Sequence, residues 1–501
     1  MKVTRRGFLA SGIAASALGG SLKSFAFPSP QNTNRKRKNV LLIMADQHQR
    51  HAMGAAGDPV AKTPNLDSLA NSGVMFDDAY CPDPVCVPSR PSMLTGMYVH
   101  NLKPYGTWPH GCKTIAHHFD RAGYMSALVG KMHFLDARTH GFDYHLGFKD
   151  WYEYLGPRAK MYAEETYYPD SGEGLPDNDD LWRESGDPWT GVIERDFRQG
   201  WAVPGRISSL PEEDHFESFV ARESIRFLKN FGKEQPFFMV SSFLKPHAPW
   251  MPAERFGNMF HPQDMKLPDS WGKVNLDTVP KFIREAIQYP RVTPELRDPE
   301  QAKIRIAMYY ASLAQMDDNV GKILKALKDM GLEKDTIVLY TSDHGEMLGQ
   351  HGLWQKFVFY EASSGVPLLF RVPGVTPQRV RCKTPVSLVQ LLPTLADLCD
   401  VPVTTPIDGK SFATSLRAPE KQLDTSVFVE HSLGTKNAGY MLRHGQYKYC
   451  FYVNDMPELY DLASDPEEMK NLALLPAYAP KVAEMKNQLF AWHMPEELQQ
   501  R

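Results

Sequence analysis

The chain has 501 residues, of which 42% are hydrophobic and 23% are charged, and its formal net charge is −3. This length predicts about two to four folding units of roughly 150 residues each, although large α/β folds run longer as one domain. The near-neutral charge balance gives no support for nucleic-acid binding. Beyond the N-terminus, the sequence has no apolar run long enough to span a bilayer.

The N-terminus predicts an export signal. Thr4-Arg5-Arg6-Gly7-Phe8-Leu9 has the pattern of a twin-arginine motif, a mildly apolar stretch follows, and Ser24-Phe25-Ala26 resembles a small-residue cleavage site. We therefore expect a bacterial protein that is exported by the twin-arginine translocase, is periplasmic or secreted, and has no permanent membrane anchor. The predicted divisions are a signal peptide at 1–26, a main N-terminal domain at 35–400 and a C-terminal subdomain at 401–501.

Continuous apolar runs recur along the main domain and predict strands that are buried on both faces. These runs are 39–44, 125–129, 237–243, 336–340 and 367–370. Amphipathic stretches at 216–231 and 303–330 predict helices between them. Alternating strands and helices predict a mostly parallel sheet covered on both sides, and such sheets bind ligands beyond the carboxyl ends of their strands.

Two long tracts, at 149–211 and 250–299, contain many Trp, Tyr, Asp, Gly and Pro residues and little periodicity. Tracts of this kind are usually functional loops or disordered segments, and their aromatic content favours loops that shape a substrate site. Beyond about residue 400, short strands are predicted at 426–430 and 447–452, and a final helix at 480–493.

Cys86-Val87-Pro88-Ser89-Arg90 is the most informative motif of the chain. Residues 88–95 predict a short helix, because prolines are tolerated in a first helical turn and Gly96 is placed to end it. Cys86 would then lie at a helix N-terminus, where backbone N–H groups and the helix dipole favour an anion. Taken alone, Cys86 could also be an ordinary buried thiol.

Polar motifs follow several of the predicted strands. Asp46 follows the first strand and Asp343-His344 follow another, so both fall where a ligand site is expected, and their carboxylates suit a hard cation. Three lysine-containing motifs also lie at the ends of predicted strands. They are Gly130-Lys131-Met132-His133, Lys245-Pro246-His247-Ala248-Pro249, and Gly349-Gln350-His351-Gly352-Leu353-Trp354-Gln355-Lys356.

These motifs, in this order, resemble the signature of type I sulfatases of the alkaline phosphatase superfamily. The resemblance extends from about Asn39 to Leu472 and includes Thr63-Pro64-Asn65-Leu66-Asp67. It implies an α/β fold, the alkaline-phosphatase-like sandwich, with a large mostly parallel sheet between helices and a small C-terminal α+β subdomain. The implied activity is hydrolysis of sulfate esters.

The resemblance implies that Cys86 is oxidised after synthesis to formylglycine (3-oxoalanine) by a maturation enzyme. A hydrated aldehyde carries two hydroxyls: one attacks sulfur, and loss of a proton from the other then expels sulfate. The implied catalytic residues are Cys86, Arg90, Lys131, His133, Lys245, His247 and Lys356.

The family's chemistry suggests a role for each of these side chains. Lys131 and Lys356 would bind sulfate oxygens, and His133 would help to deprotonate the second hydroxyl. Lys245 and His247 would hold sulfate or protonate the leaving alcohol. The arginine of the cysteine motif would orient the formylglycine or neutralise local charge.

The resemblance also implies one divalent metal. The expected ligands are Asp46, Gln47, Cys86, Asp343 and His344. Many family members have Asp-Asp where this chain has Asp46-Gln47. With one carboxylate fewer and one imidazole, Ca²⁺ remains the expected ion, and Mn²⁺ or another transition ion becomes an alternative.

The sequence is compatible with several substrate classes. The K-P-H-x-P motif, the export signal and the aromatic tracts predict a sulfated poly- or oligosaccharide. Asp46-Gln47, Gly130 to Phe134 and Gly352-Leu353-Trp354 also fit a choline-sulfatase-like enzyme or a phosphonate monoester or phosphodiester hydrolase of the same superfamily. If Cys86 were never oxidised, the chain would be an inactive glycan-binding relative.

Other polar residues carry weaker expectations. Three histidines are candidates for lining the substrate pocket: His100, His351 and His431. Three acidic residues are expected to cap, pair or pack: Asp317, Asp318 and Glu361. The sequence does not determine whether any of the cysteines other than Cys86 form a disulfide.

Overall fold

The structure is a computed structural model. It describes residues 37–105, 108–134, 136, 138–158, 205–233, 235–288 and 297–499. The predicted signal peptide and most of the tract at 149–211 lie outside the described residues.

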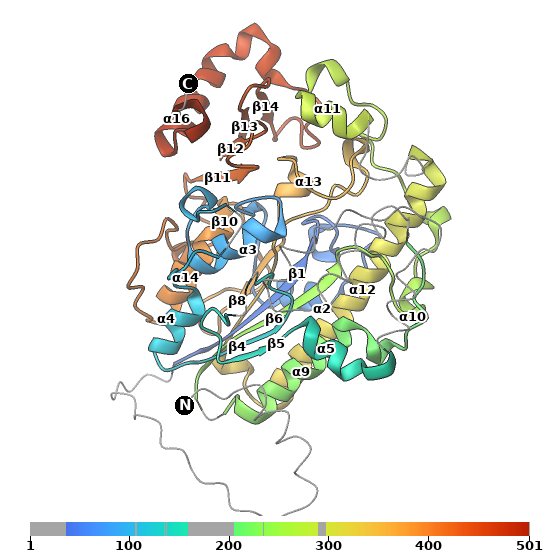
Figure 1. The fold of residues 1–501 in the computed structure, drawn as a ribbon, viewed down its shortest axis with the longest axis vertical. Coiled ribbons are helices and arrows are strands. Elements are labelled where there is room, and N and C mark those ends of the chain that lie inside the picture. The colour runs from blue at the N-terminus through green and yellow to red at the C-terminus, as the bar shows by residue number, and fades with distance from the viewer. Residues whose placement is uncertain are drawn as a thin grey trace, which may run out of the picture.

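An eight-stranded sheet forms the centre of the molecule (Figure 1). Its strands are β1 (Asn39–Asp46), β2 (Val74–Phe76), β4 (Met125–Gly130), β5 (Tyr144–Leu146), β6 (Phe237–Pro246), β7 (Thr336–Ser342), β8 (Leu368–Arg371) and β9 (Val380–Cys382). The order across the sheet is β5-β4-β6-β1-β7-β8-β2-β9. Neighbouring strands run parallel, except that β8 is antiparallel to both β7 and β2. All five predicted strands of the main domain are confirmed.

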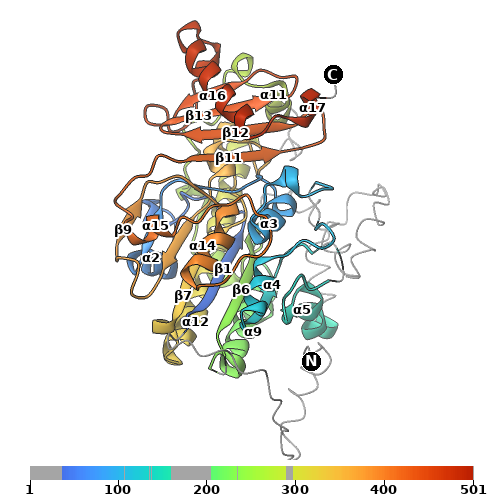
Figure 2. The same cartoon turned by 90° about the vertical axis from the view of Figure 1, so that its left-hand side faces the viewer.

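Helices cover both faces of this sheet, as Figures 1 and 2 show. One layer contains α2 (Pro64–Asn71), α9 (Phe216–Phe231) and α12 (Pro299–Asp329), and the other contains α3 (Cys86–Thr95), α4 (Ile115–Arg121) and α14 (Leu391–Leu398). Successive side chains of a strand point to opposite faces. In β1, Leu41 and Ile43 therefore pack against the first layer, while Val40 and Leu42 pack against the second. This double burial explains why β1 is apolar without alternation.

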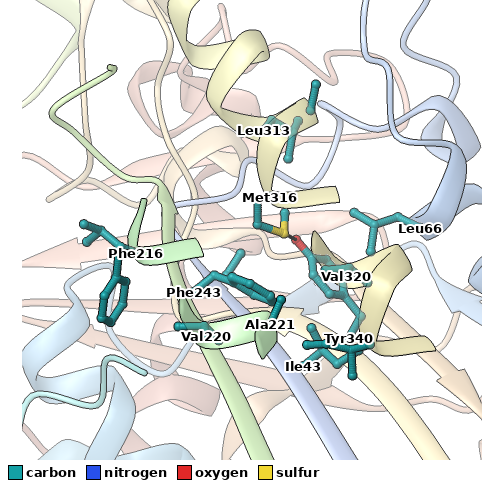
Figure 3. Close-up of a cluster of buried hydrophobic side chains, with 14 of the residues drawn as sticks. Ile43, Leu66, Phe216, Val220, Ala221, Phe243, Leu313, Met316, Val320 and Tyr340 are labelled. Carbon is teal, nitrogen blue, oxygen red and sulfur yellow. Dashed lines mark hydrogen bonds between the residues drawn. The ribbon is translucent and has the colours of Figure 1, made fainter. Parts of the chain in front are cut away.

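The core under the first layer fixes β1 and β7 in place (Figure 3). Ile43 of β1 and Tyr340 of β7 lie beside Met316 and Val320 of α12, and the Tyr340 hydroxyl is 3.9 Å from the Met316 sulfur. Full burial of a side chain of this size stabilises a fold by about 1.5–3 kcal/mol. The carboxyl ends of the two strands are therefore held by a closely packed core.

A second sheet has four antiparallel strands, β11 (Ser426–His431), β12 (Gly439–His444), β13 (Tyr447–Tyr452) and β14 (Glu458–Asp461). Together with α16 (Ala479–Trp492) it forms the upper part of the molecule, next to α3 (Figure 2). The predicted strands at 426–430 and 447–452 and the final helix are confirmed. The strands β12 and β14 were not predicted.

The remaining elements are short. They are β3 (Ala79–Tyr80), paired with β10 (Val386–Ser387), and the helices α5 (Phe148–Leu155), α10 (Glu254–Gly257), α11 (Lys281–Gln288), α13 (Glu361–Ser364), α15 (Ala413–Arg417) and α17 (Glu496–Gln499). Two of these helices, α10 and α11, lie in the tract at 250–299, which was expected to be irregular. All six cysteines are described, and each is a free thiol. None of the helices in the described ranges combines the length and apolar character needed to cross a membrane.

Candidate active site

Cys86 is the first residue of α3, as predicted, and only 6% of it is exposed. The preceding residue, Val85, has extended backbone. The helix ends where Gly96 adopts a positive φ of 71° and donates its N–H to the Ser92 carbonyl. Ser89 donates its hydroxyl to the Asp343 carbonyl at 2.6 Å, so α3 is tied to the end of β7.

Arg90 lies between the two predicted carboxylates and is fully buried. Its Nη2 is 2.9 Å from Asp46 Oδ2, and its Nε is 2.7 Å from Asp343 Oδ2. Its Nη1 donates to the Lys131 carbonyl at 2.6 Å and to Ser242 Oγ at 3.2 Å. A guanidinium has several donors in a fixed plane, so Arg90 holds the ends of several strands in one arrangement.

Asp46 is the most strongly perturbed carboxylate of this cluster. Lys131 Nζ lies 2.6 Å from its Oδ2, and the residue is completely buried. Burial alone would raise the pKa of Asp46, but the positive charges around it, Lys131 first and then Arg90 and Lys356, hold it well below its ordinary value. Asp46 is therefore ionised in the folded protein.

Lys356 connects the cysteine to the other polar groups. Its ammonium donates to Gln47 Oε1 at 2.9 Å, lies 3.0 Å from His247 Nε2 and is 4.0 Å from Cys86 Sγ. Burial raises the pKa of the Cys86 thiol, but the charges of Lys356 and Lys131 overcome this and lower it overall. The His247 Nδ1 is 2.7 Å from the Ala248 carbonyl, which fixes the orientation of the ring.

Two buried atoms point to a cation site. Among the described residues, Asp46 Oδ1 and His344 Nε2 have no hydrogen-bond partner, although the two atoms lie only 3.7 Å apart. His344 Nε2 is also 3.6 Å from Asp343 Oδ1. His344 Nδ1 is 2.9 Å from the Gly345 carbonyl, and donation to that oxygen leaves a lone pair on Nε2. Cys86, Asp343 and His344 offer ligand atoms within 4.8 Å of one another. These residues fit a divalent cation.

Gln47, the residue after Asp46, contacts Asp343, Lys356 and Glu346. It has a positive φ of 65°, and its N–H donates to Asp343 Oδ1 at 3.2 Å. Its amide oxygen accepts from Lys356, and its amide nitrogen donates to Glu346. The side chain therefore supports the lysine in this structure, and its role as a metal ligand stays a prediction.

His133 follows β4 together with Lys131. Its Nδ1 is buried and lacks a hydrogen-bond partner among the described residues, and its φ is 56°. Burial, reinforced by the charges of Lys131 and Arg90, lowers the pKa of His133 well below its ordinary value. Its imidazole is therefore neutral, as a proton acceptor must be.

Lys245 differs from the other predicted residues because its described contacts lie outside the Asp46–Cys86 cluster. Its ammonium donates to the Pro249 carbonyl, and its backbone N–H donates to Glu217 Oε1 at 3.1 Å. Burial lowers the pKa of Lys245 to about 8. Its role toward the sulfate or the leaving alcohol stays a prediction.

Glu346 is a buried residue of the site that sequence reasoning missed. Its Oε1 accepts from the N–H groups of Leu348 and Gln355, at 3.0 and 2.6 Å, and its Oε2 accepts from Gln47. It thus supports the loop that carries Lys356. Its place three residues after Asp343 was the only available signal.

The three histidines that were candidates for lining the substrate pocket lie in different environments. His351 stacks on Tyr360 and lies 2.9 Å from the Glu467 carbonyl, so it belongs to the packing between subdomains. His431 lies 3.1 Å from Asp83, three residues before Cys86. His100 contacts Glu430 at 2.6 Å.

The three acidic residues cap or pair as expected. Asp317 accepts from the N–H groups of Asn65 and Leu66 at the start of α2. Asp318 pairs with Arg255, and Glu361 pairs with Lys448.

Comparisons with known proteins agree with this geometry. Residues 38–401 match the sequence model of the family described as Sulfatase, and residues 349–494 match that of the N-sulphoglucosamine sulphohydrolase C-terminal region. The choline-sulfatase of Rhizobium meliloti is 29% identical over 87% of this chain and 82% of its own length. The N-acetylglucosamine-6-O-sulfatase of Bacteroides thetaiotaomicron is 26% identical over 91% of this chain and 86% of its own length. The crystal structure of the phosphonate monoester hydrolase of Agrobacterium radiobacter is 26% identical, with a TM-score of 0.75, over 91% of this chain and 95% of that one.

The fold and the site define a hydrolase of the alkaline phosphatase superfamily. Within it, the chain belongs to the type I sulfatase family and is a sulfuric ester hydrolase.

Proposed function

We propose that this enzyme removes sulfate from a sulfated poly- or oligosaccharide. The observation that carries the proposal is the match of residues 349–494 to the N-sulphoglucosamine sulphohydrolase C-terminal region. That segment includes His431, which is held by Asp83 just before the predicted nucleophile and whose side chain is 15% exposed. A polar side chain at this place suits a substrate rich in hydroxyl groups. The N-acetylglucosamine-6-O-sulfatase relative supports the same substrate class.

We further propose that Cys86 is converted to formylglycine and that the enzyme uses one divalent metal, Ca²⁺ in first place. The formylglycine would supply the nucleophile, and the cation would polarise the sulfate oxygens. Asp46, Asp343 and His344 would hold the cation, together with the side chain at position 86. The unpartnered Asp46 Oδ1 and His344 Nε2 support this ligand set.

The surrounding residues then bind sulfate and move protons. Lys131 and Lys356 place two ammonium groups around position 86, where they would bind the sulfate oxygens. Lys356 lies 3.0 Å from His247 Nε2, so a proton passed to that nitrogen would make His247 an acid for the leaving alcohol. The neutral His133, with its unpartnered Nδ1, would accept the proton that is released when sulfate leaves.

The choline-sulfatase and phosphonate monoester hydrolase relatives favour a second candidate function, hydrolysis of choline sulfate or of a phosphonate monoester or phosphodiester. A carbohydrate enzyme should prefer sulfated sugars strongly. An enzyme of the second kind should show the reverse order.

The test is release of sulfate and phosphate by the metal-loaded enzyme, co-expressed with a formylglycine-generating enzyme. The panel holds sulfated mono- and oligosaccharides, choline sulfate and a phosphodiester. We expect release from a sugar sulfate, and loss of that release in Cys86→Ala. Activity only on choline sulfate or the phosphodiester would establish the second candidate. Sugar binding that survives Cys86→Ala, without release from any compound, would mark an inactive glycan-binding relative.

The predicted twin-arginine signal lies outside the described residues, so export to the periplasm or the medium is part of the proposal. The partners that it requires are the twin-arginine translocase and the formylglycine-generating enzyme. Fractionation of cells with an Arg5→Lys, Arg6→Lys variant would show whether export depends on these two arginines.

A further inference from the structure

Arg305 is a buried arginine that lies between two tryptophans. It belongs to α12, and it is completely buried. Its guanidinium carbon is 4.0 Å from the centre of the Trp250 ring and 4.8 Å from the centre of the Trp354 ring. Both indoles are buried as well. A desolvated cation on an aromatic face is stabilised by about 2 kcal/mol. The three side chains therefore hold one another in place.

The two tryptophans belong to the segments that carry His247 and Lys356. Trp250 lies three residues after His247, and its indole N–H donates at 2.7 Å to the carbonyl of the residue before His247. Trp354 lies two residues before Lys356. The His247 Nε2 and the Lys356 ammonium are 3.0 Å apart. Arg305 therefore connects two segments whose polar side chains meet in the active site.

Arg305 also interacts with the acidic residue that supports the second of these segments. Burial lowers the pKa of Arg305 to about 9, and the negative charge of Glu346 opposes this shift in part. Arg305 therefore carries its positive charge at pH 7. The Glu346 carboxylate accepts the Gln355 N–H at 2.6 Å, next to Lys356. Apolar side chains of similar volume are often at least as stabilising as a buried charge. A charge at this position therefore suits an effect on the active site, beyond filling of the core.

We propose that Arg305 is a positioning residue, which sets the approach of His247 Nε2 to the Lys356 ammonium. This inference rests on the proposed function, in which His247 gives a proton to the leaving alcohol. Since Arg305 is completely buried, it acts through the two indoles and not on the substrate. An acid must lie within about 2.6–3.2 Å of the oxygen that it protonates. A misplacement of about 1 Å costs on the order of 100-fold in rate.

The leaving group of the ester reports on this role. When the S–O bond to the alcohol breaks, the alcohol oxygen takes up the proton of His247 Nε2. A sugar or choline hydroxyl is a poor leaving group and needs this proton. The 4-nitrophenolate anion is stable and leaves without it. Loss of the positioning residue should therefore slow hydrolysis of the alkyl ester and spare the aryl ester, whereas general damage to the fold slows both.

The experiment compares kcat and KM of wild type, Arg305→Met and Arg305→Lys on an alkyl ester and on 4-nitrophenyl sulfate. The alkyl ester is a sulfated sugar or choline sulfate, so the test does not depend on which of the two the enzyme prefers. Arg305→Met removes the charge, and Arg305→Lys keeps a charge but lacks the planar group that stacks between two rings. We expect kcat on the alkyl ester to fall about tenfold or more in Arg305→Met and about threefold or more in Arg305→Lys. KM and the rate on 4-nitrophenyl sulfate should change by less than about threefold.

The matched control is Arg255→Met. Arg255 also stacks on an aromatic ring, with its guanidinium carbon 3.9 Å from the centre of the Phe256 ring, but its side chain is 51% exposed. Its variant should hydrolyse both esters as wild type does. Thermal unfolding of each variant shows whether it is folded. If Arg305→Met does not fold, Arg305→Lys decides, and a wild-type kcat of Arg305→Lys on the alkyl ester would contradict the proposal.

His247→Gln separates this proposal from the proposed function. It should show the same selective loss on the alkyl ester, and adding Arg305→Met to it should lower kcat little further, because both changes remove the same step. Equal losses of His247→Gln on both esters would overturn the role of His247 as the acid, together with the inference that rests on it. A selective loss in His247→Gln without one in the Arg305 variants would overturn the positioning role alone.

Discussion

Glu346 shows how one side chain can set the position of Lys356, the lysine proposed to bind sulfate. Its carboxylate accepts two backbone N–H groups of the 346–356 loop and the side-chain amide of Gln47. Gln47 in turn accepts from Lys356. Glu346 is therefore a positioning residue, and its effect on catalysis should pass through Lys356.

We expect Glu346→Ala to lower kcat/KM at least tenfold and to destabilise the fold by about 2–4 kcal/mol, because buried N–H groups lose their acceptor. Glu346→Gln keeps an acceptor oxygen for these groups and should recover much of both losses. Steady-state kinetics and urea unfolding measure the two effects. Glu285→Ala, at a side chain that is 56% exposed, is the control. Unchanged kinetics in Glu346→Ala would show that the loop is held by other contacts.

At the scale of elements, the end of β6 is joined to α9 through Lys245 and Glu217. The pKa of Lys245 is lowered from 10.5 to about 8 because the ammonium is buried. Between these two pKa values the unfolded chain binds more protons than the folded one, so the free energy of unfolding rises with pH in this window. Below about pH 8 the cost of the buried charge is complete and constant.

The expected contribution of Lys245 is a rise of about 3 kcal/mol between pH 8 and 10.5. The measurement is urea unfolding of wild type and Lys245→Met across this range. Wild type should gain stability relative to the variant as the pH rises. A difference that does not change with pH would show that Lys245 keeps its ordinary pKa and is hydrated.

The sequence predicts the elements of the central sheet better than those of the second sheet, for a physical reason. The strands β1, β6 and β7 are buried on both faces, so their apolar runs are continuous. The strand β12 mixes Arg443 and His444 with apolar residues, and β14 has only four residues. Such short mixed segments have no clear period.

In the candidate site, too, the sequence predicts what regular strands determine and does not predict what irregular segments determine. The approach of Asp46 and Asp343 follows from parallel strands that end at one edge, which the sequence predicts. The partners of the Lys245 ammonium and of the Gln47 amide, Pro249 and Glu346, lie in irregular segments after strands. A periodic pattern in the sequence does not predict the conformation of such segments.

At the scale of the whole molecule, a buried ion cluster joins the two subdomains. Lys448 of β13 pairs with Glu361 at 2.9 Å and with Glu468, and the Glu361 N–H donates to Glu468. Burial raises the pKa of Glu468 to about 7, while Arg50 and Lys448 outweigh burial and hold the pKa of Glu361 below its ordinary value. The Lys448 ammonium is thus shared by two carboxylates, and Arg50 also pairs with Glu361.

Lys448→Met should destabilise the protein by about 3–5 kcal/mol, because it leaves the buried Glu468 carboxylate without its ion-pair partner and Glu361 with Arg50 alone as its close partner. Differential scanning calorimetry should show a lower Tm. The control is Lys481→Met, which removes a surface pair worth at most about 1 kcal/mol. A variant as stable as wild type would mean that Arg50 and Arg443 alone balance the cluster.

The position of β1 at the centre of the sheet has a consequence during synthesis. Its two neighbours, β6 and β7, are encoded far downstream, so the middle of the sheet cannot assemble until β7 has left the ribosome. At about 5–20 residues per second, translation from Cys86 to that point takes tens of seconds. Throughout this interval the cysteine, later enclosed at the start of α3, stays accessible on a nascent chain. If Cys86 is converted to formylglycine as proposed, the strand order gives the maturation enzyme time to reach it.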